Sequence, residues 1–182
     1  MRRVLVSLLA IIFALCSVAQ PAQANPRTGE DIAELIYGIY CTREPERQDP
    51  APDTASGFIN IVPGLPDFAF QQKVVPAEIG IGFGVLVTAR QGRILDPVTI
   101  TVTHPPYPDS GITVESWVTD IDGMGPSLAG YSFDTPNELV TGAWTFEGHD
   151  AAGVELFHIT FEVVDPAMMP QVIDTCFDAF LS

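Results

Sequence analysis

The stretch LAGYSFDTPNELVTGAWTFEGHDAAGVELFHITFEVV, residues 128–164, decides the fold of this chain. Its last part alternates apolar and polar residues, which is the period of a β-strand with one buried face. Asp150 to Gly153 is typical of a hairpin turn, and Trp144 and Phe146 share one face of the strand before it. The stretch predicts a hairpin that packs through one face, with these inward positions on its second strand: Phe157, Ile159, Phe161 and Val163.

The turn also implies a register for this hairpin. If His149 pairs with Val154, His158 lies opposite Thr145, so the two histidines are not cross-strand neighbours. A zinc site needs three or four converging ligands. With His104 as the only other histidine, we expect no metal site.

Alternation also marks strands at residues 74–89 and 97–106, and further strands are predicted at 58–62, 113–120 and 128–133. Residues 34–42 could form a strand or a helix, and we favour a strand because Tyr, Ile and Cys are dense and Gly38 disfavours a helix interior. Residues 43–57 are polar and rich in proline, which predicts an exposed loop. Short strands separated by Pro and Gly turns predict an all-β fold, an antiparallel β-sandwich of immunoglobulin-like type. Apolar residues return at helical spacing in 169–181, which predicts a short C-terminal helix.

Gly80, Gly82 and Gly84 share one face of the strand predicted at 74–89. Their spacing differs from that of a dinucleotide-binding loop, and no helix pattern follows them. We therefore interpret these glycines as a bulge or a close approach by another backbone.

The N-terminal segment predicts export. Arg2 and Arg3 precede an apolar run at 4–18, and Ala22 and Ala24 occupy the small-residue positions of a cleavage site. A membrane anchor needs about 20 apolar residues, so this shorter run favours a signal peptide at 1–24. We expect a single domain at 25–182, periplasmic or secreted, with no membrane insertion after cleavage.

Cys41 and Cys176 remain after such a cleavage, and an even pair in an oxidising compartment predicts a disulfide. Two separate buried thiols are the rival interpretation. Because Cys176 lies on the apolar stripe of the predicted helix, the bond would attach that helix to the first strand.

The chain carries 23 acidic and 8 basic residues, a net charge of −15, and no Lys or Arg follows Arg93. This charge excludes nucleic acid and anionic membrane surfaces as partners. We favour solubility as its role over binding of divalent cations. Asp120 and Asp122 resemble the start of a calcium loop, but the distal ligands are missing and turn chemistry explains them better. We expect no cofactor.

The segments PAPDTASGFINIV, VPAEIGIGFGVLV, GYSFDTPNELVTGAWTFE and FHITFEVV resemble a bacterial family, domain of unknown function 3859. The resemblance covers about residues 34–165 and rests mainly on the run from Gly130 to Glu147. It implies a β-rich, immunoglobulin-like domain and supplies no activity. The helix at 169–181 and the disulfide lie outside what it implies.

Four residues of the late motif are candidates for a surface site: Tyr131, Asp134, Glu138 and Trp144. We favour a structural interpretation, in which Tyr131 anchors a corner, Asp134 caps the turn and Trp144 fills the core. No Gly-x-Ser-x-Gly elbow is present, and no catalytic constellation identifies an enzyme.

Two functions stay open. The first is a non-enzymatic binding or interaction module of the cell envelope, whose partner is an envelope protein or a glycan. The second is a glycan-binding accessory domain, or an enzyme with a carboxylate-based site, that uses Tyr107, Trp117 and Tyr131. A concave cleft lined by aromatic side chains and two carboxylates would favour the second.

Overall fold

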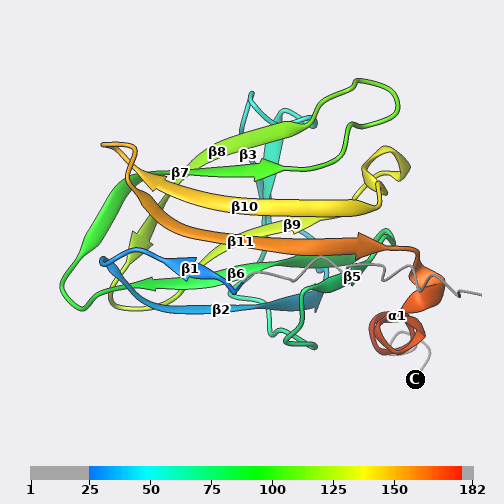
Figure 1. Cartoon of the computed structure of the whole chain (residues 1–182), viewed down its shortest axis with the longest axis horizontal. Helices are drawn as coiled ribbons and strands as arrows, with labels where there is room; N and C mark the ends of the chain where they lie inside the picture. The colour runs from blue at the N-terminus through cyan, green and yellow to red at the C-terminus, as the bar shows by residue number, and fades with distance from the viewer. Residues whose placement is uncertain (1–24, 178–182) are drawn as a thin grey trace, which may run out of the picture.

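Two sheets face each other across the apolar core, and both are antiparallel apart from one short parallel pair (Figure 1). The computed structural model describes residues 25–177. The larger sheet has the order β1-β11-β10-β7-β8, and β5 pairs with β11. Its strands are β1 (Arg27–Thr28), β5 (Val74–Pro76), β7 (Ile94–Thr103), β8 (Val114–Asp122), β10 (Gly142–Asp150) and β11 (Glu155–Val164). This arrangement confirms the predicted all-β, immunoglobulin-like sandwich.

The smaller sheet has the order β2-β6-β9, and a separate hairpin pairs β3 with β4. Short helices lie between and after the late strands. The bounds are β2 (Ile32–Cys41), β3 (Arg47–Pro50), β4 (Phe58–Ile61), β6 (Ile81–Ala89), β9 (Ser127–Ser132), η1 (Pro136–Glu138), η2 (Pro166–Met168) and α1 (Pro170–Phe177).

Aromatic rings fill the space between the two sheets. Phe83 of β6 is fully buried, and its ring centroid lies 5.7 Å from that of Trp144 and 5.2 Å from that of Phe161. Both partners belong to the larger sheet. Since burying one such side chain contributes about 1.5–3 kcal/mol, this contact layer holds the sheets together.

The prediction of one strand over residues 74–89 is wrong. β5 ends at Pro76 and pairs with β11, whereas β6 begins at Ile81 in the opposite sheet. Between them Gly80 adopts a φ of +88°, a conformation that favours glycine. The chain turns here from one sheet to the other. Ile79, which an unbroken strand would place on the same buried face as Ile81 and Phe83, is therefore 40% exposed.

The prediction of a loop over residues 43–57 is also wrong in part, because it contains β3. Arg47 pairs with Ile61 and Pro50 pairs with Phe58. Cross-strand pairing with the apolar strand β4 overrides the weak strand propensity of these polar residues.

The terminal hairpin forms where the sequence predicts it, but the predicted register is wrong. His158 lies opposite Glu147, and Thr145 pairs with Thr160. His149 pairs with Glu155 across a register shift between Gly148 and His149. The turn places Glu155, where Val154 was predicted, opposite His149, and a β-bulge adds one more residue, so together they move the pairing of His158 by two residues.

The predicted disulfide is present and joins Cys41 at the end of β2 to Cys176 in α1. In Figure 1, α1 lies at the end of the sandwich where β11 finishes. Val172 and Cys176 are the buried residues of this helix. The structure confirms a short C-terminal helix, and its predicted continuation past Phe177 lies outside the described residues.

The predicted signal peptide, 1–24, also lies outside the described residues. Within residues 25–177, no helix is long and apolar enough to span a bilayer.

Candidate ligand pocket

The β3–β4 hairpin closes the open side of the sandwich, where the edge strands β8 and β9 of the two sheets lie. Figure 1 shows this hairpin running across the direction of the sandwich strands. Near its turn, the amide of Ala55 donates to Oε2 of Glu115 on β8 over 2.6 Å. On β4, the side-chain amide of Asn60 donates to Asp134 over 2.7 Å. The hairpin is thus attached to the sandwich at two separated points.

A cavity of about 250 Å³ lies between the hairpin and these edge strands. We call it the hairpin pocket. Aromatic side chains from four segments line it, namely Tyr40, Phe58, Trp117 and Tyr131. Polar groups on its walls include Asn60, Thr119, Ser132, Asp134 and Glu138. Three of its lining residues are acidic (Glu115, Asp134 and Glu138) and none is basic.

A neighbouring hollow extends the pocket toward the segment after β2. The two share Asn60, Ser132 and Asp134. This hollow adds Arg43 and Glu44, which carry opposite charges. A ligand longer than the pocket could therefore continue along this polar surface.

Tyr40 forms part of the pocket floor because two glycines leave space for its ring. A Cβ atom added at Gly82 would overlap the Tyr40 ring, and one added at Gly130 would lie 2.7 Å from its hydroxyl oxygen. The Tyr40 hydroxyl lies 3.4 Å from both Tyr131 O and Ser132 Oγ. Burial raises the pKa of Tyr40 to about 12, so its hydroxyl stays protonated. At Gly82 a side-chain ring makes the close approach, and not the backbone that the sequence predicted.

Glu115 accepts a group of hydrogen bonds at the inner end of the pocket. The hydroxyls of Tyr107 and Tyr131 donate to Oε1 over 2.7 and 3.1 Å, and these two oxygens lie 2.6 Å apart. Glu115 is 2% exposed. Burial opposes its ionisation, but contact with His104 and bonds from Tyr107 and Ala55 offset that cost and hold its pKa below the ordinary value.

His104 packs behind this carboxylate as a buried aromatic ring. It stacks on Tyr107 and Trp144, with centroid distances of 4.1 and 4.6 Å. Its Nδ1 donates to Pro105 O over 2.7 Å, because a carbonyl only accepts. Its Nε2 lies 3.3 Å from Glu115 Oε1 without the alignment of a hydrogen bond. The buried Nε2 atom is thus left without a hydrogen-bond partner among the described residues.

The corner after β9 presents two more carboxylates to the pocket. Oε2 of Glu138 accepts from the amides of Asp134 and Thr135 over 2.6 and 3.0 Å, so Glu138 caps the turn that was assigned to Asp134. The side chain of Asp134 binds Asn60 instead. Burial raises the pKa of both Asp134 and Glu138.

The four candidate residues of the late motif do not lie together in the structure. Tyr131, Asp134 and Glu138 line the hairpin pocket, whereas Trp144 lies fully buried in the core and donates its indole N–H to Val140 O over 3.0 Å. Of the aromatic residues considered for glycan binding, Trp117 lines the pocket. Tyr107 is only 1% exposed and lies behind Glu115.

Sequence reasoning missed Tyr40, Asn60 and Glu115 as members of the pocket. One signal was available for Glu115. It alternates with Trp117 and Ile121 on β8, so the strand period places its charge on the inward face. An inward-facing carboxylate needs hydrogen-bonding partners and marks a polar site.

Asp122 and the two cysteines have structural roles. Asp122 Oδ1 accepts from the amide of Met124 over 2.7 Å, which is turn chemistry. Cys41 and Cys176 are bonded to each other and supply no thiol nucleophile.

Comparison with known proteins adds the family. The comparison with curated proteins gave no match. Among solved structures, the chain is similar to an immunoglobulin-like protein from Pseudomonas aeruginosa, with 23% identity, 79% of this chain and 99% of that chain covered, and a TM-score of 0.49. A family model described as a domain of unknown function, DUF3859, matches residues 30–163, and the chain belongs to this family.

Proposed function

We propose that this protein is a non-enzymatic binding module that holds a neutral saccharide in the hairpin pocket. The observation that carries the proposal is the composition of the pocket, in which aromatic side chains, carboxylates and an amide converge without a basic residue. Each wall of the pocket selects one property of the ligand.

The aromatic walls favour a flat apolar face on the ligand. Trp117 and Phe58 offer ring surfaces, and carbohydrate rings present C–H faces that pack on aromatic groups. The pocket is also small, about 250 Å³, which suits one or two sugar rings. The hollow beside Asp134 leaves room for a longer chain.

The polar groups favour hydroxyls and oppose anions. Carboxylate oxygens of Asp134 and Glu138 accept from hydroxyls, and Asn60 and Ser132 can donate or accept. Phosphate and carboxylate ligands would be repelled by three acidic neighbours, since no basic residue lines the pocket.

The pocket carboxylates already accept hydrogen bonds from the protein, which favours ligand binding over hydrolysis of a glycosidic bond. Both oxygens of Glu115 already accept hydrogen bonds, and Oε2 of Glu138 holds two backbone amides. A glycosidase needs one carboxyl to give a proton and a second to act as base or nucleophile. Groups committed to the fold serve that role poorly.

Export completes the proposal. The disulfide between Cys41 and Cys176 supports an oxidising compartment, and the signal-peptide pattern at 1–24 supports secretion into the periplasm or beyond. Glycans of the cell envelope are ligands available there. An envelope protein as partner stays a prediction.

Calorimetric titration tests the proposal with glucose, galactose, N-acetylglucosamine and their disaccharides, with glucose 6-phosphate and glucosamine as charged probes. We expect a neutral sugar to bind and the phosphorylated sugar to fail. Trp117→Leu should weaken binding at least tenfold, whereas Val118→Ala on the opposite face of the same strand should change it less than twofold. Absence of neutral-sugar binding, preference for an anionic sugar, or turnover of a chromogenic glycoside would overturn the proposal.

A further inference from the structure

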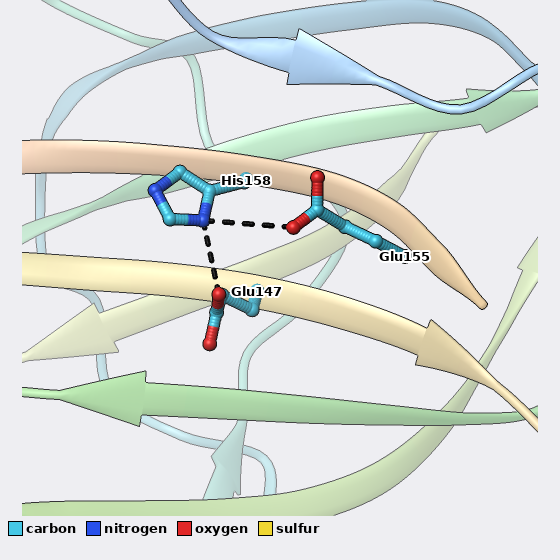
Figure 2. Close-up of side chains that lie close together, drawn as sticks. All are labelled: Glu147, Glu155 and His158. Atoms are coloured by element: carbon cyan, nitrogen blue, oxygen red, sulfur yellow. Dashed lines mark hydrogen bonds and ion pairs between the residues drawn. The ribbon is translucent and has the colours of Figure 1, made fainter. Parts of the chain in front are cut away.

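Three potential metal ligands converge on the outer face of the larger sheet, on strands that do not line the hairpin pocket. Figure 2 shows Glu147, Glu155 and His158 with their polar groups turned toward one another. His158 Nδ1 lies 3.0 Å from Glu147 Oε1 and 3.8 Å from Glu155 Oε2. One donor atom from each residue lies within 4.8 Å of the others.

The backbone explains why these three side chains meet. Glu147 of β10 pairs directly with His158 of β11, so their side chains lie on one face. Glu155 and His158 are three residues apart, and a regular strand would place them on opposite faces. The bulge opposite Gly148 and His149 inserts one extra residue, Leu156, and turns Glu155 to the face of His158.

The surrounding charges prepare the carboxylates as ligands. Arg27 on β1 contacts Glu155 through two nitrogens, at 3.3 and 3.1 Å. Arg27 thereby places a positive charge beside this carboxylate. It also fixes the orientation of the carboxylate, which is the usual task of a group one shell outside a metal.

We propose that Glu147, Glu155 and His158 form a zinc site in which water supplies the fourth ligand. An imidazole nitrogen with carboxylate oxygens is a donor set that zinc accepts, whereas calcium and magnesium prefer oxygen alone. Ligand atoms about 2.0–2.2 Å from a tetrahedral zinc are roughly 3.3 Å apart. The observed distances of 3.0 and 3.8 Å bracket that spacing.

Zinc bound at this site would cross-link two strands of the larger sheet. It would join β10 to β11 across the terminal hairpin, and through Glu155 and Arg27 it would reach β1. Since the ligands converge only in the folded state, zinc would stabilise the protein by binding the native form. The site is independent of the proposed saccharide pocket.

The test uses tag-free purified protein stripped with a chelator, titrated with zinc, calcium and magnesium by calorimetry at neutral pH. We expect one saturable zinc site per chain, a rise in melting temperature on zinc addition, and at least tenfold weaker binding of calcium and magnesium. His158→Gln and Glu147→Gln should each weaken zinc binding at least tenfold and abolish the melting shift. Glu162→Gln, which removes a charge from the same strand four residues beyond His158, should change zinc affinity less than twofold.

The contrary outcomes are equally definite. No saturable zinc site, equal zinc affinity in all three variants, or calcium binding as tight as zinc would each overturn the proposal and leave the cluster as an ion-pair network. Circular dichroism of each variant in chelator establishes that it is folded. Saccharide binding by His158→Gln should match the wild type, which separates a failure of this site from a failure of the pocket.

Discussion

Single residues connect the parts of the hairpin pocket, and Glu115 connects several of them. Its carboxylate receives bonds from the loop at Ala55 and from the rings of Tyr107 and Tyr131. A buried carboxylate with these donors is stable only while the donors stay in place. The Glu115 carboxylate therefore attaches the β3–β4 hairpin to the sandwich and also positions the tyrosines at the inner end of the pocket.

Replacement of this carboxylate should be costly. Glu115→Gln leaves the hydroxyls and the amide of Ala55 with a poorer acceptor, and we expect a loss of about 3 kcal/mol in the free energy of unfolding. Urea denaturation measures it, with Glu162→Gln as the matched surface change. A loss below about 0.5 kcal/mol would contradict the assigned role.

The difference in free energy of unfolding between wild type and Glu115→Gln should depend on pH in a defined direction. The folded pKa of Glu115 lies below its ordinary value of 4.5, so the folded state binds fewer protons at this group than the unfolded state. Its stabilisation is complete above the unfolded pKa and is lost as pH falls through the folded pKa. The gap between wild type and Glu115→Gln should narrow below pH 4.5.

Gly82, which leaves space for the Tyr40 ring, gives another prediction about a single residue. Gly82→Ala places a methyl group against the Tyr40 ring and should cost about 1–3 kcal/mol through overpacking, with weaker ligand binding. Gly125→Ala meets nothing within 4 Å and should stay within about 0.5 kcal/mol of wild type. Thermal and urea unfolding compare the pair, and equal stabilities would show that Gly82 is not needed for the Tyr40 position.

Elements were predicted well where each strand carries its own apolar alternation. The terminal hairpin follows that signal, and β2, β4 and β9 also form where strands were predicted. The signal failed for β3, whose residues Arg47 to Pro50 are polar, because its strand form depends on pairing with β4. It also joined β5 to β6, since period two continues through Gly80 although the chain changes sheet there.

The pocket was harder to predict than the strands for a related reason. Its walls come from β2, β4, β8, β9 and the corner after β9, and only long-range pairing brings these segments together. Tyr131 and Glu138 were found because they lie in one motif. Asn60 has no local signal, because its role is a bond to Asp134, distant in sequence.

We expect the β3–β4 hairpin to open locally, independently of the two sheets of the sandwich. Asn60→Ala removes its bond to Asp134, and we expect faster hydrogen exchange across residues 47–61 with little change in the β6 and β10 core. Gln48→Ala removes the side-chain bond from Gln48 to Asn60 but none from the hairpin to Asp134. Equal exchange in the two variants would contradict the proposed attachment.

The disulfide fastens α1 to β2 across a sequence separation of 135 residues. Loop-closure entropy predicts that Cys41→Ala with Cys176→Ala costs about 4 kcal/mol. Chemical denaturation with and without reductant measures this cost. The wild type should lose stability in reductant and the double variant should not, and an unchanged wild type would contradict a structural role for the bond.

The two candidate sites lie on separate parts of the molecule. The hairpin pocket lies at the β8–β9 side, and the Glu147, Glu155 and His158 cluster lies on the outer face of the larger sheet. The net charge of −15 disfavours anionic ligands in general. Fold class, charge and disulfide followed from the sequence, whereas the concave site required the three-dimensional arrangement of edge strands.

Mapping of backbone amide chemical shifts by NMR tests the central claim most directly. Titration with the neutral sugar that binds best in calorimetry should perturb residues 54–62, 115–119 and 128–138, which surround the hairpin pocket. Trp117→Leu should reduce these perturbations, and Val118→Ala should preserve them. Perturbations confined to the outer face of β10 and β11, or none with any neutral sugar, would contradict the account.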